Sequence, residues 1–86
     1  MSLYLIDKPF GANGLELAAL DREATVVLIQ DGIYLDASRL SGKPVYALAA
    51  DVKRRGLDAR LPAWIKRIDY PDLIDLVVAQ KVFNFA

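Results

Sequence analysis

Short apolar runs separated by polar turns form the main pattern of this chain. Residues 24–29 are the clearest run, because they hold four consecutive large aliphatic side chains with no polar residue among them. Strands buried on both faces have this character, and they are typical of parallel sheets covered by helices on each side. Runs at residues 3–6 and 45–49 predict two more strands. Residues 65–69 carry two basic side chains, which favours an edge strand, and the alternating residues 82–85 allow a fifth strand at an edge.

Helix signals lie between the strands. After a loop at residues 7–11, Asn13 predicts the start of a first helix, because Glu16 three residues later can complete a capping box. Residues 33–40 place apolar side chains at helical spacing and predict a short second helix, which Gly42 would end. Both segments follow predicted strands, as the crossovers of a parallel sheet require.

Two further helices complete the alternation of strands and helices. Asp51 is placed to cap a brief helix over residues 52–55, and Pro71 fits the first turn of a last helix, where its missing N–H is harmless. With right-handed crossovers, this order predicts a three-layer α/β/α sandwich on a mainly parallel sheet of four to five strands. No repeat or linker interrupts the sequence, so residues 1–86 are expected to form a single domain.

The chain is rich in apolar residues for its length. Of its 86 residues 55% are hydrophobic, and the mean hydropathy is +0.25. A chain of this size buries only about 60–65% of its unfolded surface, so its own core cannot hide every apolar side chain. The last helix is apolar around much of its circumference, and Phe83 and Phe85 are expected to be exposed. This surplus predicts contacts with other subunits.

Charge and missing residue types narrow the function. The 11 Lys and Arg residues balance 11 Asp and Glu residues, so no general field attracts nucleic acid and direct RNA binding is not expected. No apolar stretch approaches the roughly 20 residues of a membrane span, and the N-terminus lacks a signal pattern, which predicts a cytoplasmic protein. Cys and His are absent, which excludes disulfides, thiolate nucleophiles and Cys/His zinc sites on this chain.

Polar residues follow the apolar runs at the carboxyl ends of the four predicted strands. They are Asp7, the triplet Gln30-Asp31-Gly32, Asp51 and Asp69. In a parallel sheet these ends meet at one rim, where open α/β sheets bind ligands and partners. Asp31 and its neighbours are therefore candidates for a binding edge. The structural interpretation, which we favour, is that Asp31 and Gly32 turn the chain while Asp51 caps a helix.

Two other clusters give weaker signals. The rim carboxylates resemble the acidic strand ends of magnesium-binding phosphotransfer domains, but the lysine loop of such domains is missing, so no metal is expected. The basic run at residues 53–55 is interpreted as a solvated helix face, since no aromatic residues are interleaved for base stacking. Trp64 is interpreted as a packing or interface anchor.

Three sequence blocks together resemble the TusB/DsrH family. They are VLIQDGI at residues 27–33, VYALAADVKRRGL at residues 45–57 and IDYPDLIDLV at residues 68–77. The resemblance implies a fold of the DsrE/DsrF/DsrH type, with five strands in the order 4-3-2-1-5. It also implies a small subunit of a hetero-oligomeric sulfur-relay complex beside TusC- and TusD-like subunits. That relay passes a persulfide toward thiolation of the wobble uridine of certain tRNAs, and the related DsrEFH complex serves sulfur oxidation.

The absence of cysteine decides which part of the relay this chain can play. Some relatives carry a sulfur-accepting cysteine after the first or the third strand, where this chain has residues 8–11 and 49–51 without a thiol. The leading hypothesis is thus a non-catalytic subunit, without a cofactor, that shapes a partner's cysteine site. The candidate contact residues are Gln30, Asp31, Gly32, Asp51 and Arg55. The alternative is a stand-alone homo-oligomeric protein that binds a small ligand at the same rim.

Overall fold

The computed structural model describes residues 2–57 and 60–85, which contain a five-stranded sheet with every neighbouring pair of strands parallel. The strands are β1 (Ser2–Ile6), β2 (Ala24–Leu28), β3 (Val45–Leu48), β4 (Lys66–Ile68) and β5 (Lys81–Phe85). Their order across the sheet is β4-β3-β2-β1-β5, which confirms the order that the family resemblance implied. Both predicted edge strands, β4 and β5, lie at the edges.

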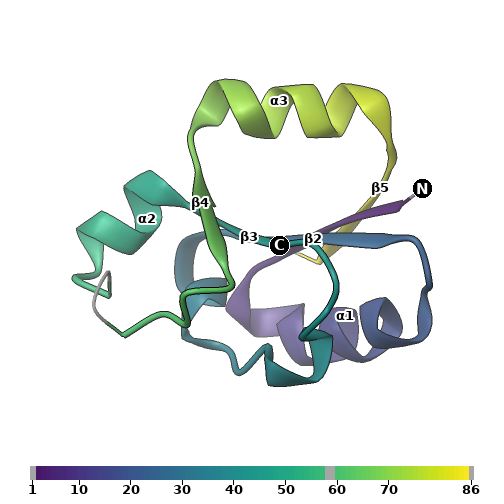
Figure 1. Cartoon of the computed structure of the whole chain (residues 1–86), viewed down its shortest axis with the longest axis horizontal. Coiled ribbons are helices and arrows are strands. Elements are labelled where there is room, and N and C mark those ends of the chain that lie inside the picture. Colours follow the sequence, from purple (N-terminus) through teal and green to yellow (C-terminus); the bar gives the residue numbers. More distant parts are fainter. Residues whose placement is uncertain (1, 58–59, 86) are drawn as a thin grey trace.

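Helices cover the two faces of the sheet, so the predicted α/β/α sandwich is confirmed (Figure 1). On one face lie α1 (Lys8–Leu20) and two 3₁₀ turns, η1 (Gln30–Tyr34) and η2 (Ser38–Leu40). On the other face α3 (Tyr70–Ala79) runs along the sheet. The short helix α2 (Ala49–Arg54) follows β3 directly and lies beside the carboxyl ends of the strands.

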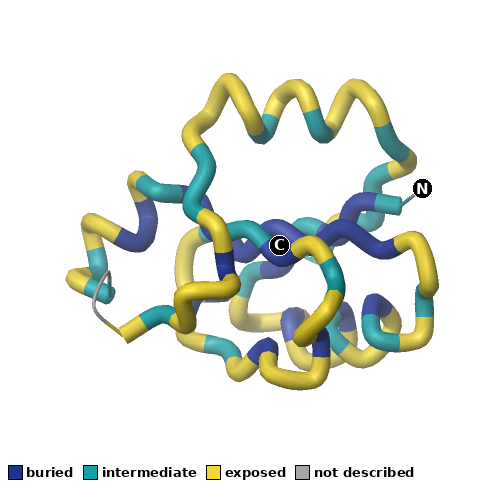
Figure 2. The backbone as a smooth tube through the Cα atoms, viewed as in Figure 1, coloured by how far each residue is buried: buried dark blue, intermediate teal, exposed yellow. Residues whose placement is uncertain are grey.

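The main core lies between the sheet and α1 (Figure 2). Alternate strand residues point to this side, among them Ile6, Val26 and Leu28, which are fully buried. Gly14 lets α1 approach the sheet closely, because an added Cβ would lie 2.4 Å from Cδ1 of Ile6 and 2.8 Å from the Phe85 ring. On the opposite face none of the residues of α3, all of them described, is buried.

The start of the first helix differs from the sequence prediction. The loop predicted at residues 7–11 is helical, and α1 begins at Lys8 with Asp7 as its N-cap. The Asp7 carboxylate accepts a hydrogen bond from the Lys8 backbone N–H at 2.6 Å, and Pro9 occupies the first turn, where no donor is needed. Asn13 lies exposed inside the helix, so the prediction of a capping box there was wrong.

The second predicted helix is also different. Residues 33–40 do not form one helix, because η1 begins earlier, at Gln30, and the backbone is extended at Leu35 before η2. The predicted helix at residues 52–55 is α2, which begins at Ala49 with Leu48 as its N-cap, so Asp51 lies inside the helix and does not cap it. Gly56, with φ of +66°, ends α2 as predicted.

The phenylalanines of β5 were expected to be exposed, and that expectation was wrong. Phe83 and Phe85 are half-buried and stack on Tyr4, with ring centroids 5.2 Å and 6.2 Å apart. Their register beside β1 points them to the same face as Tyr4, where they extend the core under α1. The Tyr4 hydroxyl in turn donates to Asp21 Oδ2 at 3.0 Å, which ties the end of α1 to the sheet.

Candidate functional site

The five candidate contact residues are brought together at the carboxyl ends of β2 and β3. Gln30, Asp31 and Gly32 belong to η1, which follows β2, while Asp51 and Arg55 lie in and directly after α2. Hydrogen bonds join the two segments across a separation of 21 to 24 residues. We call this set of five residues the strand-end rim. The structure thus confirms that they are neighbours, while a role in binding stays a prediction.

Asp51 is the centre of the strand-end rim. Its residue surface is only 3% exposed, and its Oδ2 accepts a hydrogen bond from the Gln30 backbone N–H at 2.7 Å. Its Oδ1 lies 3.5 Å from Nη1 of Arg55. A buried carboxylate is costly unless donors and a cation surround it, and here both are present. Asp51 therefore caps η1, whose own N-cap residue makes no side-chain hydrogen bond, and does not cap α2.

Arg55 links Asp51 to the surface. Its Nε donates to Asp31 Oδ1 at 2.9 Å, and its side chain is 18% exposed, against 57% for Asp31. The hydrogen bond to Asp31, followed by the charges of Asp31 and Asp51, raises the pKa of Arg55 against the opposing effect of partial burial. The guanidinium stays charged at every physiological pH, so Arg55 keeps its positive charge in the brace that it forms between η1 and α2 through Asp31 and Asp51. Of the two carboxylates that Arg55 contacts, Asp31 is the one exposed to solvent.

Gln30 and Gly32 form a tight junction with the end of β1. Gln30 adopts a φ of +48°, which is uncommon for a residue with a side chain. A Cβ on Gly32 would lie 2.1 Å from the Ile6 carbonyl oxygen and 2.9 Å from its carbon. That same Ile6 oxygen accepts the Ile29 N–H at 2.9 Å. The triplet therefore turns the chain under steric constraint, as the structural interpretation of the sequence expected.

Asp7 and Asp69, the two other carboxylates that follow predicted strands, lie outside the strand-end rim and act at helix N-termini. Asp7 caps α1, and Asp69 caps α3 by accepting the Asp72 backbone N–H at 3.0 Å. A hydrogen bond between the Asp69 and Asp72 side chains, together with the charges of Asp69 and Asp75, raises the pKa of Asp72. Among residues 2–57 and 60–85, no group of three or more Asp or Glu residues is arranged to hold a metal ion.

The rim encloses little space. A hollow of about 170 Å³ lies beside Gln30 and Asp51 and is also lined by Arg54, Tyr70 and Leu73. Pockets for drug-sized molecules occupy about 300–1,000 Å³, so this hollow is small for an organic ligand. Sequence reasoning had not placed Tyr70 or Leu73 near the rim. Their positions one and four residues after the strand-end residue Asp69, in the first turn of the last predicted helix, are the signal that would have done so.

The basic run divides between solvent and the rim. The Arg54 side chain is 70% exposed, with Nη1 4.0 Å from Asp51 Oδ1, and Lys53 is exposed as well. Arg55 is turned inward. Trp64 is 38% exposed, so it stays a candidate interface residue. In the part of the chain that the structure describes, no helix has the length and apolar character needed to cross a membrane.

The chain is similar to proteins of one family. A family model described as DsrH like protein matches residues 9–82. Protein TusB of Photorhabdus laumondii subsp. laumondii is 36% identical over 67 residues, which cover 69% of this chain and 70% of that protein. Protein TusB of Salmonella paratyphi B is 30% identical over 82 residues, covering 81% of this chain and 86% of that protein. The crystal structure of the ychN protein from E. coli shares the fold, with a TM-score of 0.78, 17% identity and coverage of 98% and 97%.

Proposed function

This chain belongs to the DsrH-like family, and from this premise we propose that it is a non-catalytic subunit of a cytoplasmic sulfur-relay complex that supports thiolation of the tRNA wobble uridine. The observation that carries the proposal is the match to TusB proteins in a chain without cysteine. Without a thiol, the chain cannot carry a persulfide itself. Its role in the relay is then to hold or shape a cysteine site on TusC- or TusD-like subunits.

The geometry of the strand-end rim supports a contact role over catalysis. Its buried carboxylate is satisfied by Gln30 and Arg55, so no free acid or base is positioned for proton transfer. Asp31 remains on the surface, where a neighbouring subunit can meet it. The hollow of about 170 Å³ gives no specific support to the alternative of a stand-alone protein that binds a small ligand.

The test is genetic and chemical. Deleting the coding sequence from its native cell should lower the 2-thiouridine content of tRNA, measured by mass spectrometry of nucleosides, and re-expression should restore it. An unchanged content of 2-thiouridine, with loss of sulfur oxidation, would place the complex in the oxidative pathway.

A second measurement tests the non-catalytic role. The purified chain is incubated with a cysteine desulfurase and cysteine, alone or with the TusC- and TusD-like subunits from the same genome. Persulfide should accumulate only on those subunits. A persulfide-sized mass shift on the isolated chain would contradict the proposal, because this sequence offers no sulfur other than Met1.

A further inference from the structure

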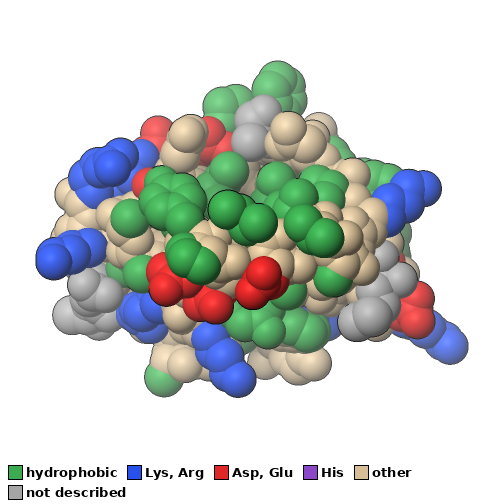
Figure 3. All heavy atoms as spheres, turned by 90° about the horizontal axis from the view of Figure 1, so that it is seen from above, with side chains coloured by type: hydrophobic (Ala, Val, Ile, Leu, Met, Phe, Trp, Pro, Cys, Tyr) green, Lys and Arg blue, Asp and Glu red, His purple; other side chains and the backbone are tan. Residues whose placement is uncertain are grey.

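The outer surface of α3 is apolar. Four large side chains on it are exposed: Tyr70 by 54%, Ile74 by 60%, Val77 by 38% and Val78 by 81%. Their spacing places them on one side of the helix. We call these four residues the α3 face. Viewed from this side of the molecule, hydrophobic side chains gather into one patch with acidic side chains along its edge (Figure 3). Scattered exposed apolar residues are ordinary, but a contiguous patch marks an interaction site.

The inner surface of α3 does not explain the apolar composition of the α3 face. Leu73 and Leu76 are half-buried and line hollows together with Leu48 and with Tyr46 of the sheet, so they supply the packing of this helix on the strands. A helix of this length draws most of its stability from packing, because isolated helices of 10 residues are marginal in water. Cover on its outer side would add the packing that the sheet does not provide.

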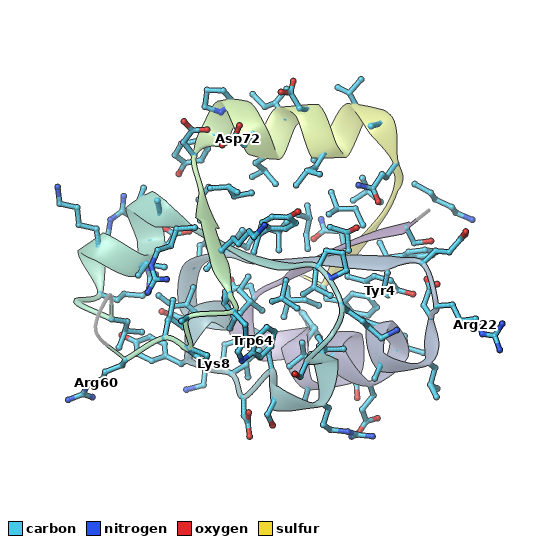
Figure 4. All side chains as sticks on the ribbon, in the orientation of Figure 1. Tyr4, Lys8, Arg22, Arg60, Trp64 and Asp72 are labelled. Carbon is cyan, nitrogen blue, oxygen red and sulfur yellow. The ribbon has the colours of Figure 1, made fainter. Side chains whose placement is uncertain are left out.

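The charged side chains on α3 itself are all negative. Asp72 and Asp75 lie on the helix and Asp69 caps it, and the helix contains no Lys or Arg. Figure 4 shows Asp72 at the N-terminal end of α3, in the layer far from α1. Lys81 is the first cation in the sequence after α3. It alternates with residue 82 along β5 and therefore points to the same side of the sheet as Phe83, the α1 side. Its Nζ lies 5.2 Å from the centroid of the Phe83 ring. The α3 face therefore presents apolar surface with the carboxylates of its own helix along one edge, while Arg54 lies beside Tyr70 at the rim.

We propose that the α3 face docks on another subunit of the relay complex, through a surface that is apolar at its centre and carries Lys or Arg at its edge. This inference rests on the proposed function, because that function supplies the TusC- and TusD-like subunits as partners. Opposite charges at the rim of such a contact steer association and select the correct partner.

A second copy of this chain fits the α3 face less well. In a two-fold dimer the same patch meets itself, so acidic side chains would face acidic side chains across the axis. Like charges in that position disfavour association. Within one chain the pKa of Asp72 is already raised, first by its side-chain hydrogen bond with Asp69 and then by the like charges of Asp69 and Asp75. A basic edge on the partner relieves this repulsion, whereas a second copy adds to it.

The experiment compares two exposed apolar pairs on opposite layers. Ile74→Gln/Val78→Gln changes the α3 face, and Leu17→Gln/Leu20→Gln is the matched control on α1, since those leucines are 50% and 84% exposed. Each variant is titrated against the purified TusC- and TusD-like subunits of the same genome by calorimetry. The α3 variant should weaken binding by about tenfold or more, which corresponds to at least about 1.4 kcal/mol. The α1 variant should stay within about twofold of the wild type, well under that threshold.

A charge variant tests the acidic edge separately. Asp75→Asn should weaken binding and flatten its dependence on salt, because screening then has one fewer charge pair to remove. Circular dichroism of each variant checks that the fold is retained.

The outcomes separate the two proposals. If the wild type binds these subunits and the α3 variant binds equally well, or if only the α1 variant loses binding, the α3 face is not the docking surface. Sedimentation showing a wild-type homodimer that Ile74→Gln/Val78→Gln converts to a monomer would make a second copy the occupant and overturn the inference. If the wild type does not bind these subunits at all, the proposed function is wrong, and the docking surface inferred from it is wrong as well.

Discussion

The two faces of the sheet are covered by helices of different character. On one face α1 packs closely, with Gly11, Gly14 and Ala18 buried against the strands. On the other face α3 has no buried residue, although Leu3 and Val27 of the sheet beneath it are fully buried. These two positions of β1 and β2 are thus shielded from water on the α3 side, yet of the two helices only α1 has buried residues of its own. We infer that the α1 layer supplies stability and that the α3 layer is left available for association.

The largest expected effect comes from comparing one isoleucine on each layer. Ile6→Ala in the α1-side core should lower the free energy of unfolding by about 2–5 kcal/mol, since Ile6 is fully buried and a cavity would remain. Ile74→Ala on α3 should change it by less than about 0.5 kcal/mol. Urea unfolding of the isolated chain followed by circular dichroism measures both. Equal losses would show that α3 is as much a part of the core as the α1 side.

The strand-end rim should show the same contrast between buried and exposed groups. Asp51→Ala removes the acceptor of the Gln30 N–H and leaves Arg55 with one fewer partner, so it should cost about 1–3 kcal/mol of stability. The control Asp31→Asn touches only the exposed end of the brace and should cost at most about 1 kcal/mol. Binding to the relay subunits should survive Asp31→Asn if the triplet is a turn, and its loss would favour the binding interpretation.

Helix caps provide a smaller comparison between the two layers. Asp7→Ala should lower the unfolding free energy by about 1 kcal/mol, because Asp7 caps the helix that closes the core. Asp69→Ala should instead increase hydrogen exchange of the α3 amides with little change in the strands, as expected for local opening. Asn13→Ala is the control, since Asn13 is exposed inside α1 and its replacement should leave the unfolding free energy unchanged. A loss of stability in this variant would show that Asn13 acts as a helix cap after all.

The smallest effects concern pH, and they have opposite signs on the two layers. Hydrogen bonds from the Glu23 N–H and then from the Tyr4 hydroxyl lower the pKa of Asp21, so its stabilising contribution is present above the ordinary carboxyl pKa of about 3.9 and is lost as the pH falls through the folded value. The pKa of Asp72 is raised, so its contribution is present below the ordinary value and is lost as the pH rises through the folded one.

Melting temperatures measured between neutral and acidic pH test these signs. Asp21→Asn should melt below the wild type at pH 7 and Asp72→Asn above it. Both differences should shrink toward low pH, where the wild-type carboxyls are protonated. Melting differences of the same sign for the two variants would contradict the assignment.

Much of the fold followed from local patterns in the sequence. The apolar run at residues 24–29 predicted a strand buried on both faces, and all five residues of β2 are buried. The rule that parallel strands end at one edge correctly brought Gln30, Asp31 and Gly32 together with Asp51 and Arg55. The strand order came from the family resemblance and could not be read from the apolar pattern.

The errors arose where two local signals competed or where the partner was distant in sequence. Asp7 and Asn13 are both good caps, and Pro9 in the first turn decided for Asp7. Asp51 had the chemistry of a cap, but the N–H that it caps is 21 residues away, on Gln30. The alternation at Phe83 and Phe85 predicted a strand but not that its aromatic side would lie on Tyr4. Tertiary packing chose among locally equivalent options in each case.

The close approach of Gly32 to the Ile6 carbonyl also determines how a saturation mutagenesis scan of this chain would read. With 2.1 Å between an added Cβ and that oxygen, every substitution at residue 32 should deplete the protein from the cell. The same scan should tolerate polar replacements at Asp31, one residue earlier in the chain. Intolerance at position 32 in an abundance screen would therefore report the close contact between η1 and the end of β1. In an activity screen the same intolerance would look like that of a residue that touches a partner.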